Sequence, residues 1–208
     1  MSIEINSDTD SLWDKFLTGD DKAFAGIYYA IIQSLLSYGN KLTQDRDMLR
    51  DSVQEIFLDL YQKRGKHVAP IHKIKPYLMI ALKNSILKKL HQGRKFEDLK
   101  VDDHLMGEFY VEYSFQDQLI SRETSDHTKL RLQQAISTLS SRQKEIIYLK
   151  FEEELGYREI ALMMNITVES ARKQLYRALF SLKETLDSEV FHLLFCIFLK
   201  KSSKVVHV

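Results

Sequence analysis

Residues that interrupt a helix are scarce in this chain. It has only 7 glycines and 2 prolines among 208 residues, whereas leucine, lysine, glutamate, glutamine and alanine, which favour helices, are plentiful. Runs of β-branched residues, which favour strands, are short. A chain of this length has room for one medium domain or two small ones. We therefore expect an all-α protein built from two small helical domains.

The charge distribution separates the two expected domains. Residues 62–96 contain ten lysines or arginines and no acidic residue, whereas residues 97–126 contain nine acidic residues and two basic ones. The acidic part also lacks clean helical periodicity, so we interpret residues 93–127 as an acidic linker. The first domain is then expected at residues 10–92, the second at residues 128–187 and a C-terminal tail at residues 188–208.

Local patterns define helices in the first domain. Asp20 is a predicted N-cap, and Pro76 suits the first turn of a later helix. An apolar stripe runs through residues 49–60, and four acidic residues at intervals of four lie opposite it. Like charges at this spacing cost a helix about 0.2 to 0.5 kcal/mol per pair, which a basic partner would offset. A solvated acidic face is the alternative interpretation.

The basic segment at residues 63–95 also contains aromatic residues. Such a surface suits the phosphates and unpaired bases of partly single-stranded DNA, and a basic protein-binding face is the alternative. The chain has no phosphate-cradling glycine loop, and its 7 histidines lack the spacing of metal ligands. We therefore expect no enzyme, no cofactor, no metal site and no small-molecule substrate.

The second domain contains a helix-turn-helix pattern. Residues 157–164 and 168–182 each have helical periodicity. Between them, Asn165 occupies the turn position that favours a left-handed backbone, and Thr167 is the predicted N-cap of the second helix. One side of that helix is apolar, at Ala171, Leu175, Ala178 and Leu182, and the opposite face is net basic. Such a helix suits the major groove of DNA, although an amphipathic hairpin in an ordinary bundle is the alternative.

Two sets of motif residues resemble bacterial sigma factors of the sigma-70 family, in the extracytoplasmic-function (ECF) group. The region 2 pattern is matched by Gly19, Asp20, Ala23, Phe24, Asp51, Val53, Gln54, Glu55 and Phe57. The region 4 pattern is matched by Leu132, Leu139, Gln143, Glu145, Leu149, Tyr157, Glu159, Ile160, Ala161, Leu175, Arg177, Ala178 and Leu182. The chain departs from the family at Tyr77, where many members have tryptophan. It also departs at Asn165, in place of the turn glycine, and at Leu139-Ser140, in place of Leu-Pro.

The resemblance implies a protein that binds core RNA polymerase and directs promoter recognition and transcription initiation, without catalysis. The surface that docks on the coiled coil of the polymerase β′ subunit would comprise Asp47, Asp51, Gln54, Glu55, Phe57 and Asp59. The −10 promoter element would be bound by Lys73, Lys75, Tyr77, Lys83, Asn84, Lys88 and Lys89. The −35 element would be bound by Thr167, Glu169, Ser170, Arg172, Lys173, Tyr176 and Arg177.

The resemblance also implies partners: the β′ and β subunits of core RNA polymerase, promoter DNA, and an anti-sigma factor, which is often membrane-anchored. The polar, acidic N-terminus does not look like a signal peptide, so we expect a cytoplasmic protein. The apolar residues 190–199 are too few to cross a bilayer, which takes roughly 20. Two other functions fit the residues less closely. One is a dimeric helix-turn-helix regulator that does not act through core polymerase, and the other is a helical adaptor that binds only protein.

Overall fold

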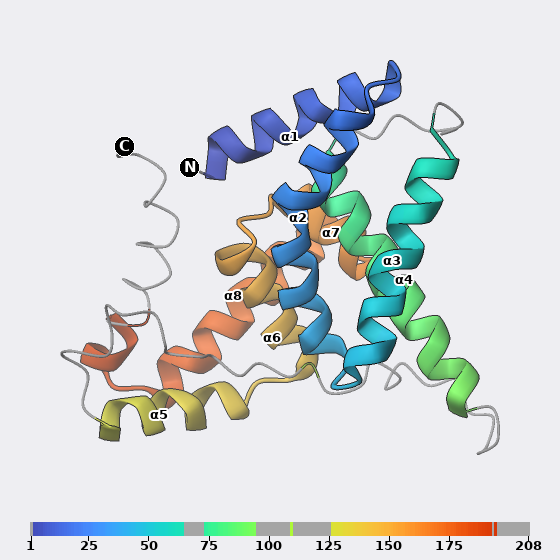
Figure 1. Cartoon of the computed structure of the whole chain (residues 1–208). Coiled ribbons are helices and arrows are strands. Elements are labelled where there is room, and N and C mark those ends of the chain that lie inside the picture. Colours follow the sequence, from blue (N-terminus) through green and yellow to red (C-terminus); the bar gives the residue numbers. More distant parts are fainter. Residues whose placement is uncertain (1, 65–72, 95–108, 110–125, 193, 195–208) are drawn as a thin grey trace. The chain divides into compact units, whose positions relative to one another are not determined.

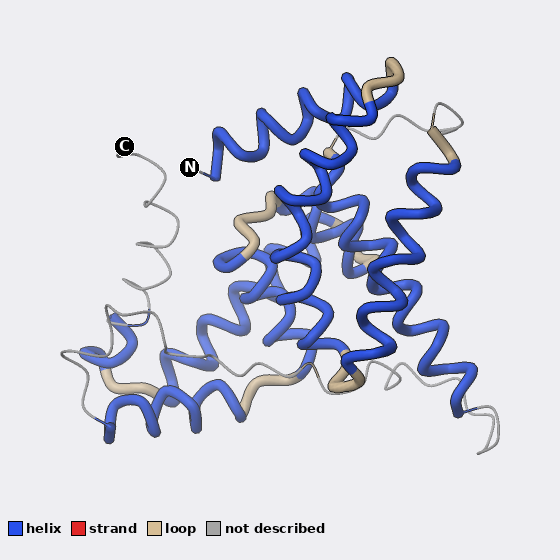
Figure 2. The backbone as a smooth tube through the Cα atoms, viewed as in Figure 1, coloured by secondary structure: helices blue, strands red, loops and turns tan. Residues whose placement is uncertain are grey.

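The computed structural model describes residues 2–64, 73–94, 109, 126–192 and 194. Every regular element in these ranges is a helix, which confirms the predicted all-α class (Figures 1 and 2). The chain divides into two compact units, Met1–Glu108 and Phe109–Val208. Their boundary falls inside residues 93–127, the segment interpreted as a linker. Most of that segment lies outside the described residues.

The described residues of the first unit form α1 (Ser2–Leu17), α2 (Asp21–Leu42), α3 (Arg46–Gln62) and α4 (Ile74–Arg94). Helix α1 begins earlier than the domain boundary predicted at residue 10. The Asp20 carboxylate accepts hydrogen bonds from the backbone N–H groups of Lys22 at 2.8 Å and Ala23 at 3.3 Å, which confirms the predicted cap. Pro76 is the third residue of α4, where no intrahelical N–H bond is lost.

Helix α2 lies at the centre of the first unit and packs against α1, α3 and α4. The predicted apolar stripe of α3 is buried throughout, and the apolar residues Ile74, Leu78, Met79, Leu82 and Ile86 of α4 are buried as well. Burying a large apolar side chain stabilises a fold by about 1.5 to 3 kcal/mol. The largest side chains that are fully buried in this unit are those of Phe16, Ile27, Ile31, Leu35, Tyr38, Leu60, Ile74, Leu78, Met79 and Leu82.

The second unit contains α5 (Asp126–Ser137), α6 (Ser141–Ile147), the π-helical turn η2 (Tyr148–Glu152), α7 (Tyr157–Met164) and α8 (Val168–Thr185). Helix α8 packs against α5, α6 and α7. Ser140 caps α6 in a capping box with Gln143: its hydroxyl accepts the N–H of Gln143 at 3.3 Å, and the Gln143 side chain accepts the N–H of Ser140 at 2.9 Å. The core includes Leu132, Ala135, Ile146, Leu149, Ile160, Ala171, Leu175, Ala178 and Leu182.

The chain turns after α8 and resumes a helical conformation at residues 188–192. The Asp187 carboxylate accepts a hydrogen bond from the N–H of Val190 at 2.8 Å and also pairs with Arg131 of α5. Val190 and Leu194 are buried. The beginning of the predicted tail therefore packs as a further helical piece. Its remainder lies outside the described residues, and among the helices described here none is both long and apolar enough to span a membrane.

Candidate functional site

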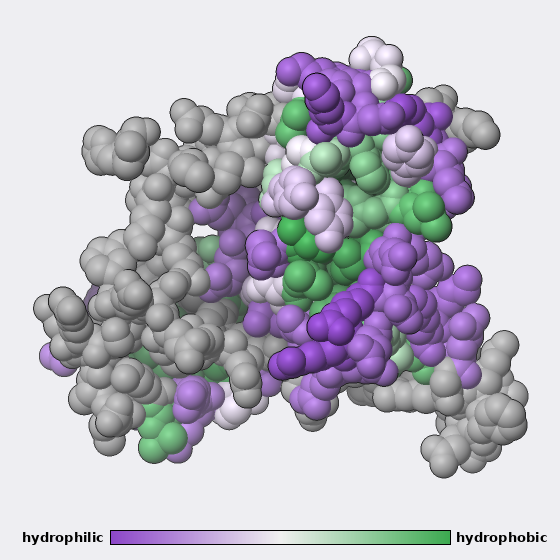
Figure 3. Space-filling view, viewed as in Figure 1, coloured by the Kyte–Doolittle hydropathy of each residue, from purple (hydrophilic) through white to green (hydrophobic). Residues whose placement is uncertain are grey.

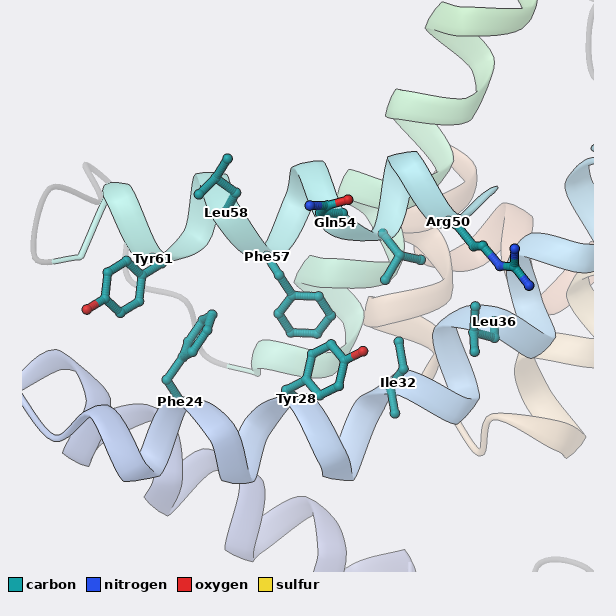
Figure 4. Close-up of a pocket in the computed structure, with 10 residues that line it drawn as sticks. Phe24, Tyr28, Ile32, Leu36, Arg50, Gln54, Phe57, Leu58 and Tyr61 are labelled. Carbon is teal, nitrogen blue, oxygen red and sulfur yellow. The ribbon is translucent and has the colours of Figure 1, made fainter. Parts of the chain in front are cut away.

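An apolar groove of about 600 Å³ lies between α2 and α3 on the surface of the first unit. The two helices are antiparallel here, so that Phe24 at the start of α2 lies opposite Tyr61 at the end of α3 (Figure 4). The ring centroids of Phe24 and Tyr61 are 5.2 Å apart, and those of Tyr28 and Phe57 are 4.9 Å apart. In the space-filling view an apolar strip is visible over these helices between hydrophilic surfaces (Figure 3). Leu58 adds a side chain that is 54% exposed at the edge of the groove.

Only two of the residues predicted to bind polymerase line this groove. Gln54 is exposed on its rim, and Phe57 is largely buried and forms part of its floor. The four acidic residues of α3 lie along the side of the helix next to Gln54 and Leu58. Asp47 pairs with Arg50 at 3.7 Å, and Asp59 pairs with Lys63 at 2.7 Å. Asp51 is exposed and makes no hydrogen bond or ion pair with any other part of the chain that the structure describes.

Glu55 faces α4. Its carboxylate accepts hydrogen bonds from the Ser85 hydroxyl at 3.0 Å and from the Lys89 ammonium at 3.1 Å. The hydrogen bond from Lys89 is the largest cause that lowers the pKa of Glu55, and the one from Ser85 is the next. Glu55 therefore connects α3 to the basic helix α4, and only Asp51 of the acidic row is unpaired within the described chain.

The α2 side of the groove was not among the predicted site residues. The sequence of α2 does contain a pattern that indicates this surface. A second row of apolar residues lies beside the buried row, so the apolar face of α2 is wider than packing against the core alone requires. An apolar row of this kind on a surface helix usually marks a contact with a partner. The residues of α2 that line the groove are Phe24, Tyr28, Ile32 and Leu36.

The residues predicted to bind the −10 element all lie on or next to α4, but they are not equally accessible. Lys73, Asn84 and Lys88 are exposed, and Lys75 is half-buried. Lys83 is only 6% exposed, which differs from the expectation of a phosphate-binding lysine on an open surface.

Two further members of the basic segment 63–95 are also engaged inside the first unit. Tyr77 is half-buried, and its burial is the main cause that raises the pKa of its hydroxyl. The Arg64 guanidinium lies 4.2 Å from the ring centroid of Phe16 and pairs with Asp21 at 2.6 Å. Part of the basic character of this segment therefore serves to hold the first unit together.

The helix-turn-helix has the geometry that the sequence predicts. Asn165 ends α7 with φ 52° and ψ 51°, in the left-handed region. The Thr167 hydroxyl accepts the backbone N–H of Ser170 at 3.1 Å and caps α8. The Glu159 carboxylate accepts the N–H of Gly156 at 2.5 Å and fixes the first turn of α7. These local bonds fix where α7 begins and ends and where α8 begins.

The outer face of α8 presents the residues predicted to bind the −35 element. Glu169, Arg172, Lys173, Tyr176 and Arg177 are all exposed. Glu169 and Lys173 pair with each other at 2.7 Å, so the two arginines carry the net charge of this face. Tyr176 is 69% exposed and its ring stacks on that of Phe180, a residue that the sequence pattern did not single out, with centroids 6.3 Å apart.

The described residues contain no group of three or more histidine, cysteine, aspartate or glutamate side chains arranged to hold a metal ion.

Comparisons with known proteins bear on the family of the chain. Residues 129–181, which include α6, α7 and most of α8, match the family model described as Sigma-70, region 4. Over 152 residues the chain is 26% identical to the ECF RNA polymerase sigma factor SigM of Bacillus subtilis (strain 168), covering 73% of this chain and 88% of that protein. The two comparisons together support a sigma-70 family factor of the ECF group.

A solved structure has a fold similar to that of this chain. The sigma factor RpoE, in a complex with the anti-sigma factor NepR from Bartonella quintana, has a similar fold, with a TM-score of 0.53 and 17% sequence identity. The similarity covers 79% of this chain and 96% of that one. The sigma factor family is not enzymatic.

Proposed function

We propose that this sigma factor directs core RNA polymerase to promoters by using three surfaces of its own. The α2–α3 groove binds the polymerase, α4 binds the −10 element, and the outer face of α8 reads the −35 element. The match of residues 129–181 to sigma region 4 is the observation that carries this proposal, because it falls on the helix-turn-helix with the exposed basic face. The protein supplies binding free energy and no catalytic group, and it acts in the cytoplasm.

The groove is suited to a helical partner. Its floor is made of aromatic rings, which are the residues most enriched at the centre of protein interfaces, and Leu58 and Tyr61 extend it to the surface. A helix of the polymerase β′ coiled coil with an apolar ridge and adjacent basic residues would pack its ridge between α2 and α3. Its basic residues would then meet Asp51, whose charge is not used within the described chain.

The DNA-binding surfaces differ in what they offer. Helix α4 presents Lys73 and Lys88 for phosphates, and Tyr77 and Asn84 beside them for bases. The side chain of Lys89 becomes available only if it leaves Glu55. Helix α8 presents Arg172 and Arg177, whose guanidinium groups suit guanine edges or phosphates. The −10 surface is therefore built for contact with distorted or open DNA, and α8 for duplex DNA.

An anti-sigma factor is a further proposed partner. RpoE of Bartonella quintana, which shares this fold, was solved in a complex with the anti-sigma factor NepR. An anti-sigma factor that covers the groove of this sigma factor would block the polymerase. Competition between that protein and core polymerase for one groove is the regulation we propose.

The experiment that tests the proposed function is co-elution of the full chain with sigma-free core RNA polymerase. Asp51→Lys should lower the affinity at least about tenfold, because it places a like charge against a basic partner at the interface. Asp14→Lys is the matched control, since Asp14 is an exposed acidic residue of α1 outside the groove. Equal loss with both variants, or no co-elution of the folded parent, would refute the proposal. Specific DNA binding as a dimer without polymerase would favour a conventional regulator.

A further inference from the structure

Tyr157 connects two cationic side chains in the second unit. It is the first residue of α7, and its ring is half-buried. The Arg172 guanidinium of α8 lies 5.5 Å from the centroid of this ring, and the Lys150 ammonium of η2 lies 5.1 Å from it. Both distances are within the range of a cation–π contact, which extends to about 6 Å. Tyr157 therefore contacts a residue of the proposed −35 reading face from outside α8.

The backbone that carries the ring is held independently of Arg172. The bond from the Gly156 N–H to the Glu159 carboxylate holds the first turn of α7. On the other side, the Lys150 ammonium donates to the carbonyl oxygen of Leu155 at 3.3 Å, which keeps that ammonium beside the ring. The ring thus projects from a held turn of backbone, and the long side chain of Arg172 lies against it.

A guanidinium that lies against an aromatic ring keeps its N–H donors available at its edges. These donors are the groups that bind O6 and N7 of guanine in the major groove. An unsupported arginine loses rotamer freedom when it makes such a contact, whereas a supported one has lost part of that freedom already. The neighbouring Lys173 is instead engaged with Glu169 of the same helix.

We propose that Tyr157 is a specificity-determining positioning residue, which holds Arg172 in the orientation that reads a base pair of the −35 element. The inference rests on the proposed function of α8, because it assigns a reason for selectivity to a surface already proposed to bind DNA. Tyr157 itself acts through its ring, and its hydroxyl is not required.

The test uses core polymerase loaded with the full chain. The probe is a duplex selected by this holoenzyme from a pool randomised over the −35 region, and a shuffled duplex is the reference. Tyr157→Leu should lower the ratio of selected to shuffled affinity about two- to fivefold, the size of an exposed cation–π contact. Tyr157→Phe keeps the ring and should bind like the parent. The slope of log affinity against log salt should not change, because the number of phosphate contacts is the same.

A double-mutant cycle with Arg172→Ala separates the possible outcomes. Because Arg172 is exposed, this variant is expected to fold, and Tyr157→Leu should have no further effect on selectivity in its background. An equal loss from Tyr157→Phe, an undiminished loss in the Arg172→Ala background, or unchanged selectivity of Tyr157→Leu would each overturn the inference. If the parent holoenzyme selects no sequence at all, the proposed function of α8 fails as well. If it selects a sequence for which Arg172→Ala is neutral, only the inference fails.

Discussion

Gly39 of α2 packs directly against Leu49 of α3. A Cβ atom at this position would lie 2.2 Å from Cδ1 of Leu49 and 3.3 Å from its Cγ. Both residues are buried, so the Leu49 side chain is enclosed and has little room to turn away. The contact lies beyond the end of the groove that contains Leu36 and Arg50. We therefore expect this contact to help determine the separation of the two helices that we propose bind polymerase.

Two opposing effects decide the outcome of Gly39→Ala. Alanine is better than glycine inside a helix by about 1 kcal/mol. Overpacking a filled core costs about 1 to 3 kcal/mol. We therefore expect Gly39→Ala to destabilise the first unit by roughly 0 to 2 kcal/mol. Leu49→Ala by itself should destabilise the first unit by about 2 to 5 kcal/mol. In that background Cδ1 of Leu49 is absent, so Gly39→Ala should stabilise the first unit by about 1 kcal/mol.

Urea unfolding followed by the fluorescence of Trp13 measures these differences. Trp13 is the only tryptophan in the sequence, and it is buried in α1, so its emission reports on the first unit. Ala30→Gly, at an exposed position of α2, measures the propensity difference for this helix without any packing change. If Gly39→Ala stabilises by the full propensity difference in both backgrounds, the close approach of α2 and α3 is refuted.

Three further predictions concern caps and charges. Asn165→Ala should destabilise the second unit by about 1 kcal/mol, because alanine tolerates the left-handed region poorly, whereas Asn165→Gly should leave its melting temperature nearly unchanged. The hydrogen bond from the N–H of Val190 is the main cause that lowers the pKa of Asp187 below 3.8. The stability that ionised Asp187 gives to the second unit is therefore complete above pH 3.8, and it is lost as the pH falls through the lower pKa of the folded state. Acid titration of second-unit stability should therefore be less steep in Asp187→Asn. Glu55→Gln should destabilise the first unit by about 0.2 to 1 kcal/mol in urea unfolding, and this difference should shrink at high salt as its pairing with Lys89 is screened.

The features that were predicted correctly from sequence depend on chemistry between near neighbours. Asp20 and Thr167 cap the helices that follow them, because a cap needs only a side-chain oxygen and an N–H two or three residues later. Asn165 adopts a left-handed conformation at a position that the turn spacing alone identifies. The buried stripe of α3 also follows from helical periodicity.

The features that were missed depend on contacts between distant segments. The groove exists because α2 and α3 lie side by side, and periodicity does not say which helices are neighbours. Glu55 looked equivalent to Asp51 in the acidic row, but only the fold shows that Glu55 meets Ser85 and Lys89. The contact of Tyr157 with Arg172 is likewise formed across the turn. Which acidic or basic residues are available to a partner could therefore not be read from the sequence.

The wide turn η2 (Tyr148–Glu152) makes the structure around it sensitive to the insertion or deletion of a single residue. A π-helical turn holds one residue more than an α-helical one, so deletion of a residue here would let the backbone close into an ordinary α-helix. Side chains on either side of the deletion would then rotate by about 100° relative to each other. Lys150 would leave the ring of Tyr157 and the carbonyl of Leu155. We therefore expect relatives that differ by a single insertion or deletion at this turn to fold alike and to differ in the promoters they prefer.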